Sequence, residues 1–469
     1  MTDPAPTPPE DDKQPEATNA GAPLSIEVES TPLPATEGSS PTRVIRRLAV
    51  YGVRIILFLI TLIGFLFITR GSAVRHVRSV GGDGEQVAPG EPGFALSVAI
   101  LTGTVLTTGN RAELALNGDG TFARLWDDLR AAREMITIQT YYGMQGQVSD
   151  SLRAILVERA SQGVRVLLLY DAFGTQDISA TERAELQQSG VVVVPFRPLT
   201  FSNLYILQNR SHVRGIVIDG RIGWTGGFGF DDKWLGDGVR TGWRETNVRF
   251  EGPAVRQLQA AFVAAWTEAT GVMLTGRGSV ERLDDGVATA GLLNASPTLG
   301  STAAERFVAM SIAGAQRTLY ITNAYFAPDD NFVGLLSRAA QRGVDIRLLV
   351  AGPRTDVGLA RTAGRARYET LLASGVRIYE WQPSTLHSKS FVVDGVWSTV
   401  GTMNFDNRSL VLNDEVSLMV LDADFGRQMD SIFVADLEHA AEVRIDEFRR
   451  RPWTERVMEW GARLVTRLL

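Results

Sequence analysis

The stretches SHVRGIVIDG (211–220) and LHSKSFVVDG (386–395) place a histidine, a cation and an aspartate in the same frame. The first frame runs from His212 to Asp219 and the second from His387 to Asp394, so the spacing is identical in both copies. The cation two residues after the histidine is Arg214 in the first copy and Lys389 in the second. A frame repeated in this way indicates an internal duplication.

Strand patterns before the frames repeat in the same order, at a spacing that drifts slightly from pair to pair. The matched segments are ITIQTYY (136–142) with LYITNAYF (319–326), GVRVLLLYD (163–171) with GVDIRLLVA (343–351), and SGVVVVPF (189–196) with SGVRIYEW (374–381). Helical patterns alternate with these strands, which favours βαβ units. We therefore predict an α/β fold of two homologous halves. Each half would hold its own mixed, mostly parallel sheet flanked by helices, and both histidines would meet at the axis between the halves.

The composition sets limits on the function. The chain of 469 residues is 44% hydrophobic, which is typical of globular proteins, and it has no cysteine, so disulfides and thiolate zinc sites are excluded. Only four histidines occur, two of them in the frames, which argues against an all-histidine metal cage, and we expect no cofactor. The chain has a net charge of −6, and residues 1–42 alone have a net charge of −7. The remaining residues therefore have a net charge of +1. A nearly neutral body argues against a nucleic-acid partner.

The segment RRLAVYGVRIILFLITLIGFLFITRG follows the acidic, proline-rich start of the chain. Its apolar run, 48–69, is long enough to span a bilayer at roughly 1.5 Å per residue. A cleaved signal peptide is the alternative, but the long preceding tail and the length of the run disfavour it. Three arginines on each side leave the orientation open. We expect a single-pass protein of a bacterial cell membrane, with cytoplasmic placement of the catalytic part as the working hypothesis.

The last segment, RRPWTERVMEWGARLVTRLL (450–469), has Trp and aliphatic residues on one helical stripe with arginines at its edges. This pattern predicts an amphipathic helix, which either lies on an anionic membrane surface or docks on the protein core. The predicted organisation is a disordered tail (1–43), a transmembrane helix (44–70), a linker (71–110), a first half (111–272), a second half (273–448) and the amphipathic helix (449–469).

The two frames have the residue types that phosphoryl transfer requires. Strand alternation places His212 with Arg214, and His387 with Lys389, on one face of each strand. A cation can neutralise phosphate oxygens, and an imidazole can attack phosphorus or transfer a proton. Two such faces that meet would provide one nucleophile and one general acid. The alternative, a pair of histidines with purely structural roles, would not explain the repeated cation and aspartate. Both aspartates, Asp219 and Asp394, are interpreted as structural groups at the strand ends.

Further candidates follow each frame. In GTMNFDNRS (401–409), Thr402 and Asn404 could donate hydrogen bonds to a phosphate oxygen, whereas the matching positions of the first half are Gly227 and Gly229. A glutamate follows downstream of each histidine at a similar separation, Glu245 after the first frame and Glu415 after the second. A carboxylate against the far ring nitrogen would fix the tautomer of a histidine and raise its basicity. The alternative for each glutamate is a solvated surface charge.

The motif His-x-Lys-x4-Asp, present twice, resembles that of the phospholipase D superfamily. The segments WRETNVRFEGPAVRQLQAAFVAAW (243–266) and HSKSFVVDG with GTMNFDNRS are most similar to bacterial cardiolipin synthases and related phosphatidyltransferases. The resemblance covers roughly residues 110–469. It implies one active site between two similar α/β halves, no metal, and a phosphohistidine intermediate formed on one histidine while the other transfers protons. His212 is interpreted as the nucleophile and His387 as the acid and base.

The resemblance also implies a substrate and its alternatives. The partners would be an anionic phospholipid and the lipid bilayer, and the reaction would join two phosphatidylglycerol molecules. Hydrolysis by water, a nuclease activity, and a catalytically weakened membrane scaffold remain open. The first half departs from the family pattern, because Arg214 stands where the family has Lys and Gly229 where it has Asn. Arg214 could tighten phosphate binding, change the acceptor or disturb the alignment. The sequence leaves the oligomeric state open.

Overall fold

The structure is a computed structural model that describes residues 41–70, 77, 80, 87–141, 144–175, 178–200, 208–275, 286–298 and 301–464. Residues 1–40 of the expected tail, and residues 71–76, 78–79 and 81–86 of the expected linker, lie outside the described residues. Helix α1 (Pro41–Arg70) contains the stretch Ile45–Gly64, which has a mean hydropathy of 1.9. By length and composition this stretch could cross a membrane, and among the described residues it is the one candidate.

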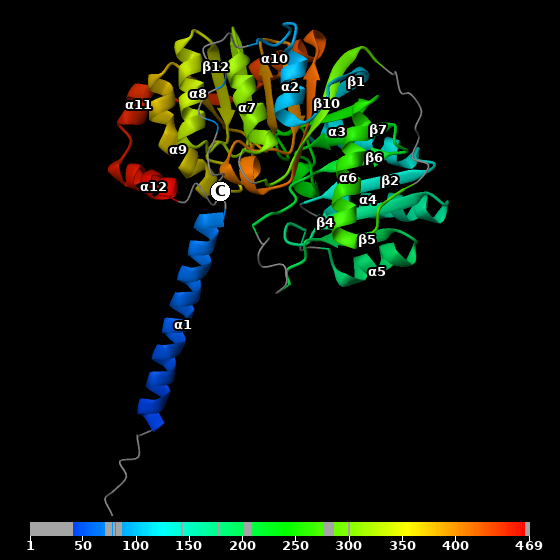
Figure 1. Cartoon of the computed structure of the whole chain (residues 1–469), viewed down its shortest axis with the longest axis horizontal. Coiled ribbons are helices and arrows are strands. Elements are labelled where there is room, and N and C mark those ends of the chain that lie inside the picture. Colours follow the sequence, from blue (N-terminus) through cyan, green and yellow to red (C-terminus); the bar gives the residue numbers. More distant parts are fainter. Residues whose placement is uncertain are drawn as a thin grey trace, which may run out of the picture. The chain divides into compact units, whose positions relative to one another are not determined.

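Two halves with the same strand order follow, as the duplication predicts (Figure 1). From the centre outward, the strands of the first half are β1 (Thr107–Leu116), β9 (Thr246–Glu251), β7 (Ile222–Gly226), β6 (Gly215–Ile218), β2 (Met135–Thr140), β4 (Arg165–Asp171) and β5 (Val192–Phe196). Those of the second half are β10 (Ala288–Ala295), β16 (Glu415–Leu421), β15 (Trp397–Gly401), β14 (Lys389–Val393), β11 (Thr318–Asn323), β12 (Asp345–Val350), β13 (Arg377–Trp381) and β17 (Ala440–Glu442). The α/β prediction with two homologous halves is confirmed.

Two details of the predicted sheets are wrong. Only β2, β4 and β5, with their counterparts β11, β12 and β13, pair in parallel, and the other neighbours in the large sheet are antiparallel. The histidine frames cause this, because each is followed by a tight hairpin that reverses the chain. The halves also do not hold separate sheets, since β1 pairs with β10 and joins them into one sheet of 15 strands.

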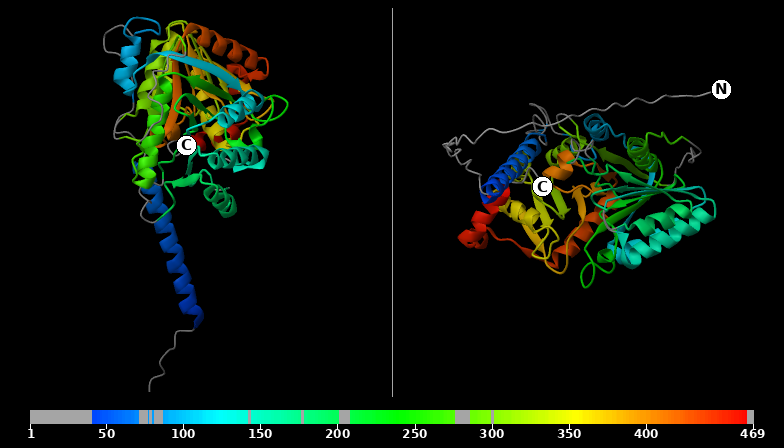
Figure 2. Two further views of the ribbon diagram at one scale, coloured as in Figure 1. Left: turned by 90° about the vertical axis from the view of Figure 1, so that its right-hand side faces the viewer. Right: turned by 90° about the horizontal axis from the view of Figure 1, so that it is seen from below.

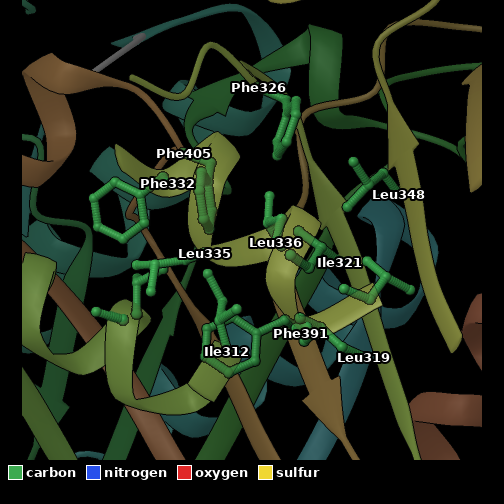
Figure 3. Close-up of a cluster of buried hydrophobic side chains, with 14 of the residues drawn as sticks. Ile312, Leu319, Ile321, Phe326, Phe332, Leu335, Leu336, Leu348, Phe391 and Phe405 are labelled. Carbon is green, nitrogen blue, oxygen red and sulfur yellow. The ribbon is translucent and has the colours of Figure 1, made fainter. Parts of the chain in front are cut away.

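Helices cover both halves and define the cores. The first half carries α3 (Asn117–Arg130), α4 (Gly146–Ser161), α5 (Ala180–Gln188) and α6 (Ala254–Thr270), and the second carries α7 (Ala303–Gly314), α8 (Asp330–Gln341), α9 (Gly358–Ala373) and α10 (Ala423–Leu437). Figure 3 shows the core of the second half, where helix residues such as Leu335 and Leu336 pack on strand residues such as Ile321. Burial on both faces explains why the central strands read as nearly continuous apolar runs.

A separate core joins the two halves. Strand β15 contacts β7 and β9, although these strands are far apart in the sheet order, so the sheet folds back on itself. Valines of both halves fill the space between, including Val248 of β9 and Val400 of β15. Figure 2 shows the two halves side by side, each with its own outer helices. The histidine strands β6 and β14 are therefore held in one packed unit.

The expected linker is wrong for residues 94–110. Helix α2 (Phe94–Thr102) begins there, and its Phe94 and Val98 are buried in the core of the second half. Strand β1 then starts at Thr107. The glycines and prolines just before this segment are typical of a linker. The short apolar run that follows them, FALSVAI, nevertheless packs as a core helix.

The two frame aspartates close equivalent hairpins. Asp219 accepts hydrogen bonds from the backbone N–H groups of Arg133, Glu134 and Met135, all at 2.8 Å. Asp394 accepts in the same way from three successive N–H groups, those of Gln316, Arg317 and Thr318. Each aspartate has a positive φ, 49° and 54°, and a glycine follows it at the next turn position. Each side chain thus ties its hairpin to the start of the neighbouring strand, at the end of the frame away from the histidine.

We expect Asp394→Ala to lower the free energy of unfolding by about 2–4 kcal/mol, because three backbone donors lose a charged acceptor. Asp394→Asn keeps one acceptor and tolerates positive φ, so its loss should be smaller. Thermal unfolding of the purified protein in detergent measures both. The control is Asp424→Ala, which removes a carboxylate that is 80% exposed at the start of α10. Equal melting temperatures for Asp394→Ala and the control would contradict the role of this turn.

Candidate active site

Backbone bonds cross from one half to the other beside each histidine. The N–H of His212 donates to the carbonyl of Asp414 at 2.9 Å, and the N–H of His387 donates to the carbonyl of Arg244 at 2.8 Å. Asp414 and Arg244 directly precede Glu415 and Glu245 in the chain. Each histidine is therefore positioned by the strand start of the opposite half.

This crossing exchanges the histidine–glutamate pairs between the halves. Nδ1 of His212 lies 3.0 and 3.1 Å from the two carboxylate oxygens of Glu415, and Nδ1 of His387 lies 2.8 Å from Oε2 of Glu245. Both glutamates are fully buried. Because Nδ1–H donates to the glutamate, Nε2 carries the lone pair, which is the form that a nucleophile or a base needs. The order of the residues along the chain contained no sign that the pairing would cross.

Both imidazole rings line one cavity of about 280 Å³. Arg214, Asn404 and Arg408 line it as well, so two guanidinium groups and an amide face the same space. Lys389 is also buried, with its Nζ donating to the backbone carbonyl of His387, but it is not among the described residues that line the cavity. The structure thus brings His212, Arg214, His387 and Asn404 to one site that has the size and charge for an anionic head group.

Burial sets the protonation of the paired groups. It raises the pKa of Glu245 to about 7 and the pKa of Glu415 to about 8. Burial, followed by the charges of Arg214 and Lys389, holds the pKa of His212 well below its usual value, and the same causes lower the pKa of His387. Burial therefore disfavours the ion pair and favours a neutral hydrogen bond between each histidine and its glutamate. An incoming phosphate would reverse the effect of the two cations and favour protonation.

Arg214 and Lys389 are not equivalent in their contacts. Nη1 of Arg214 lies 3.2 Å from Nε2 of His212, so the guanidinium donates to the reactive nitrogen. Lys389 does not use His387 in this way, since it donates to the backbone carbonyl. Burial also lowers the pKa of Lys389 to about 7, whereas an arginine keeps its proton at any physiological pH. The two imidazoles therefore have cationic neighbours of different character.

Thr402 and its counterpart Gly227 both serve the glutamates. The hydroxyl of Thr402, expected to donate to a phosphate oxygen, instead donates to Oε2 of Glu415 at 2.5 Å. A β-carbon at Gly227 would lie 2.3 Å from a carboxylate oxygen of Glu245, so only glycine fits there. Trp234 contributes a donor to Glu245 in place of the missing hydroxyl, with Nε1 at 3.5 Å. A desolvated carboxylate needs such donors.

Asn404 and Gly229 differ more. Asn404 faces the cavity, and its Oδ1 is buried without a hydrogen-bond partner in the described part of the chain. Since amide oxygen and nitrogen can exchange places by a flip, the group could present a donor to a ligand. Gly229 is buried and is absent from the cavity lining among the described residues. The first half therefore lacks a counterpart of the Asn404 amide.

Aromatic rings that the sequence did not predict lie beside both histidines. Tyr141 lies 4.9 Å from the ring of His212, and Trp243 lies 5.1 Å from the ring of His387. Tyr325 is 6.1 Å from His387 and donates its hydroxyl to Asp356. Tyr141 is the first residue after β2 and Tyr325 the second after the matched strand β11, and residues at the carboxyl ends of parallel strands commonly form binding sites. That rule could have found them.

The family follows from this arrangement and from similarity to known proteins. A family model described as "Cardiolipin synthase, PLD-like domain" matches residues 125–266 and 308–437, one segment in each half. The chain belongs to this phospholipase D-like cardiolipin synthase family. It is 36% identical over 358 residues to a cardiolipin synthase of Geobacillus sp. (strain WCH70), covering 75% of this chain and 71% of the relative. The family predicted from the two frames is confirmed.

Other relatives agree. Cardiolipin synthase A of Pseudomonas syringae pv. syringae (strain B728a) is 31% identical over 362 residues, which cover 77% of this chain and 74% of the relative. Among solved structures, phosphatidylserine synthase of Haemophilus influenzae Rd KW20 is similar with a TM-score of 0.58 and 13% identity, covering 80% of this chain and 99% of that one. At that identity the likeness concerns the fold alone.

The raised pKa of Glu415 has a consequence for stability. Between its usual pKa near 4.5 and its folded pKa of about 8, the folded state binds more protons at this group than the unfolded state does. Its contribution to stability therefore falls as the pH rises through this window. We expect Glu415→Gln to flatten the profile, so that its melting temperature gains on the parent from about pH 5.5 to about pH 8.

The control for this comparison is Asp127→Asn, a carboxylate that is 82% exposed. Its melting temperature should follow that of the parent at both pH values. A Glu415→Gln variant that instead loses ground to the parent toward the alkaline end would show that Glu415 is ionised and favourably paired in the folded state.

Proposed function

We propose that the protein is a membrane-anchored cardiolipin synthase that transfers a phosphatidyl group from one phosphatidylglycerol molecule to another. The observation that carries the proposal is that two histidines from different halves line one cavity, each held at Nδ1 by a glutamate of the other half. Family membership supports the reaction class. The apolar helix α1 supports a membrane anchor, which would confine the enzyme and its lipid substrate to the same surface.

The reaction proceeds in two displacements at phosphorus. In the first, His387 binds a proton at Nε2 when the phosphate enters, Nε2 of His212 attacks, the bond from phosphorus to the head-group oxygen breaks, and His387 gives that proton to the departing glycerol. In the second, His387 takes a proton from a hydroxyl of another phosphatidylglycerol, whose oxygen attacks phosphorus and releases His212. The products are cardiolipin and glycerol. Both imidazoles then return to their starting protonation.

The cations favour this division of roles. Arg214 stays charged, so it opposes a charged imidazole at His212 and keeps that ring in the neutral form that attacks. Lys389 has a pKa of about 7 and can lose its proton, which leaves His387 freer to accept one. When phosphate enters, the guanidinium of Arg214 can transfer its hydrogen bond from Nε2 to a phosphate oxygen and expose the nucleophile. Asn404 and Lys389 would stabilise the same phosphate.

A chromogenic donor separates the two histidine roles. With a p-nitrophenyl ester of phosphatidic acid, the leaving group needs no proton, so His387→Ala should release one p-nitrophenolate per enzyme and then stall. His212→Ala should release none. Stopped-flow absorbance measures the burst, and mass spectrometry of the stalled enzyme should find the phosphatidyl group on His212. A burst in His212→Ala with none in His387→Ala would assign the roles the other way round.

The lipid assay tests the overall reaction. Purified full-length protein in detergent with labelled phosphatidylglycerol should give cardiolipin and glycerol in equal amounts, and His387→Ala should lower the rate by at least about a hundredfold. Phosphatidic acid without cardiolipin would make the protein a hydrolase. If neither product forms in the parent, the proposed synthase activity is wrong, and nicking of plasmid DNA would then identify a nuclease.

Arg214→Lys tests whether the departure from the family pattern weakens the site. A buried lysine here can lose its proton, so the pKa of His212 should rise, and the acid limb of kcat/KM should move to higher pH. We expect activity within about tenfold of the parent at the optimum, whereas Arg214→Ala should lose about a hundredfold or more. A rise of tenfold or more in Arg214→Lys would mean that Arg214 impairs the enzyme.

A further inference from the structure

Helix α12 (Trp453–Leu464) packs on the protein with its polar face, although its sequence also has an apolar stripe that could pack there. Glu459 and Ala462 are buried, at 3% and 6% exposure. Trp453, Val457 and Trp460, which lie on the far side of the helix, are 74%, 55% and 63% exposed. We call Trp453, Val457 and Trp460 the apolar stripe. A helix that only completes a core turns its apolar residues inward, so an exposed stripe indicates a partner other than the protein core.

A buried ion network fixes this rotation of the helix. The carboxylate of Glu459 is 3.3 Å from Nε of Arg365 on α9 and 2.8 Å from Nη2 of Arg451. Ala462 packs beside Ala363 of α9, where the small side chains allow the two helices to approach closely. The stripe therefore cannot turn toward the core without breaking buried ion pairs, which is costly.

The position of the stripe relates it to the cavity. Helix α9 runs beside α12, and Val357 and Ala360 at the start of α9 line the cavity with the two histidines (Figure 1). Leu359, between them, is 49% exposed. Helix α9 therefore links α12 to the residues that border the cavity, and Leu359 adds an exposed apolar side chain at that end.

The charge around the stripe indicates its partner. Residues 449–464 contain five arginines and two glutamates, a net charge of +3, whereas the protein as a whole is acidic. Arg456 and Arg463 flank the stripe on one side and are exposed, and Arg463 also forms an ion pair with Asp330 at 3.0 Å. Tryptophans and arginines around an aliphatic stripe are suited to the head-group region of a bilayer rather than to a water-soluble partner.

We propose that the exposed face of α12 inserts into an anionic lipid surface and holds the mouth of the cavity against it. The contact with lipid stands on the stripe and its arginines alone. The delivery of phosphatidylglycerol to the histidines rests in addition on the proposed function. Both alternatives for the C-terminal segment are thereby combined, since one face docks on the protein and the other contacts the membrane.

The absence of cysteine makes a direct test simple. Val457→Cys in the full chain provides a single attachment site for a bimane fluorophore, and Ile100→Cys on α2 is the matched control, because Ile100 is 74% exposed on a helix that Figure 1 shows well apart from α12. The labelled proteins are reconstituted into vesicles of phosphatidylcholine and phosphatidylglycerol that contain doxyl lipids. Quenching should be at least about threefold stronger at position 457 than at position 100.

Removing phosphatidylglycerol from the vesicles should reduce the quenching at position 457, because the arginines lose their counter-charges. Equal quenching at both positions, or none at position 457, would overturn the proposal. This result does not depend on catalysis, so it remains decisive even if the chain makes no cardiolipin.

A kinetic measurement tests the delivery of substrate. The double variant Trp453→Glu/Trp460→Glu should raise KM for phosphatidylglycerol in vesicles about tenfold or more, and should leave kcat for dispersed dihexanoyl-phosphatidylglycerol unchanged. Leu96→Glu/Ile100→Glu on α2 is the matched control. An unchanged KM in vesicles would overturn the delivery role, while loss of kcat on the dispersed lipid would show that the substitutions damage the fold instead.

Discussion

The exchange of histidine–glutamate pairs between the two halves is the constraint on which the site depends. Neither half contains a complete pair, because the carboxylate that orients each imidazole comes from the other half. The backbone bonds from His212 to Asp414 and from His387 to Arg244 fix the exchange at main-chain level. Reactive geometry therefore exists only where both halves are docked, and the common core between β7, β9 and β15 maintains that docking.

The site buries several ionisable groups, and this burial has a chemical consequence. Burial displaces the pKa values of Glu245, Glu415 and Lys389 from their usual range. Groups that titrate near neutral pH can exchange protons with little driving force, as a histidine pair that alternates between acid and base requires. The structural donors Thr402 and Trp234 keep the two carboxylates hydrogen bonded without adding charge.

The sequence predicted the duplication, the family and the meeting of His212, Arg214 and His387 at one place, because a repeated frame of His, cation and Asp is a local pattern. It predicted neither the antiparallel majority, which the hairpins after the histidine frames produce, nor the joining of the sheets, which depends on how β1 meets β10 after the chain has folded. The sequence also did not predict that Glu245 pairs with His387 and Glu415 with His212, each across the two halves. Tyr141, Trp243 and Tyr325 were missed because aromatic residues at strand ends resemble core residues until the cavity beside them is seen.

The pairing of β1 with β10 also bears on how the molecule could come apart. The backbone pairing that links the halves is short and irregular, with Thr107 opposite Ala290 and Asn110 opposite Ala288, but separation would still leave one edge of β1 and one edge of β10 unpaired. Such edges recruit other strands and promote aggregation. Although its two halves repeat one fold, the molecule is therefore a poor candidate for division into two independently soluble fragments.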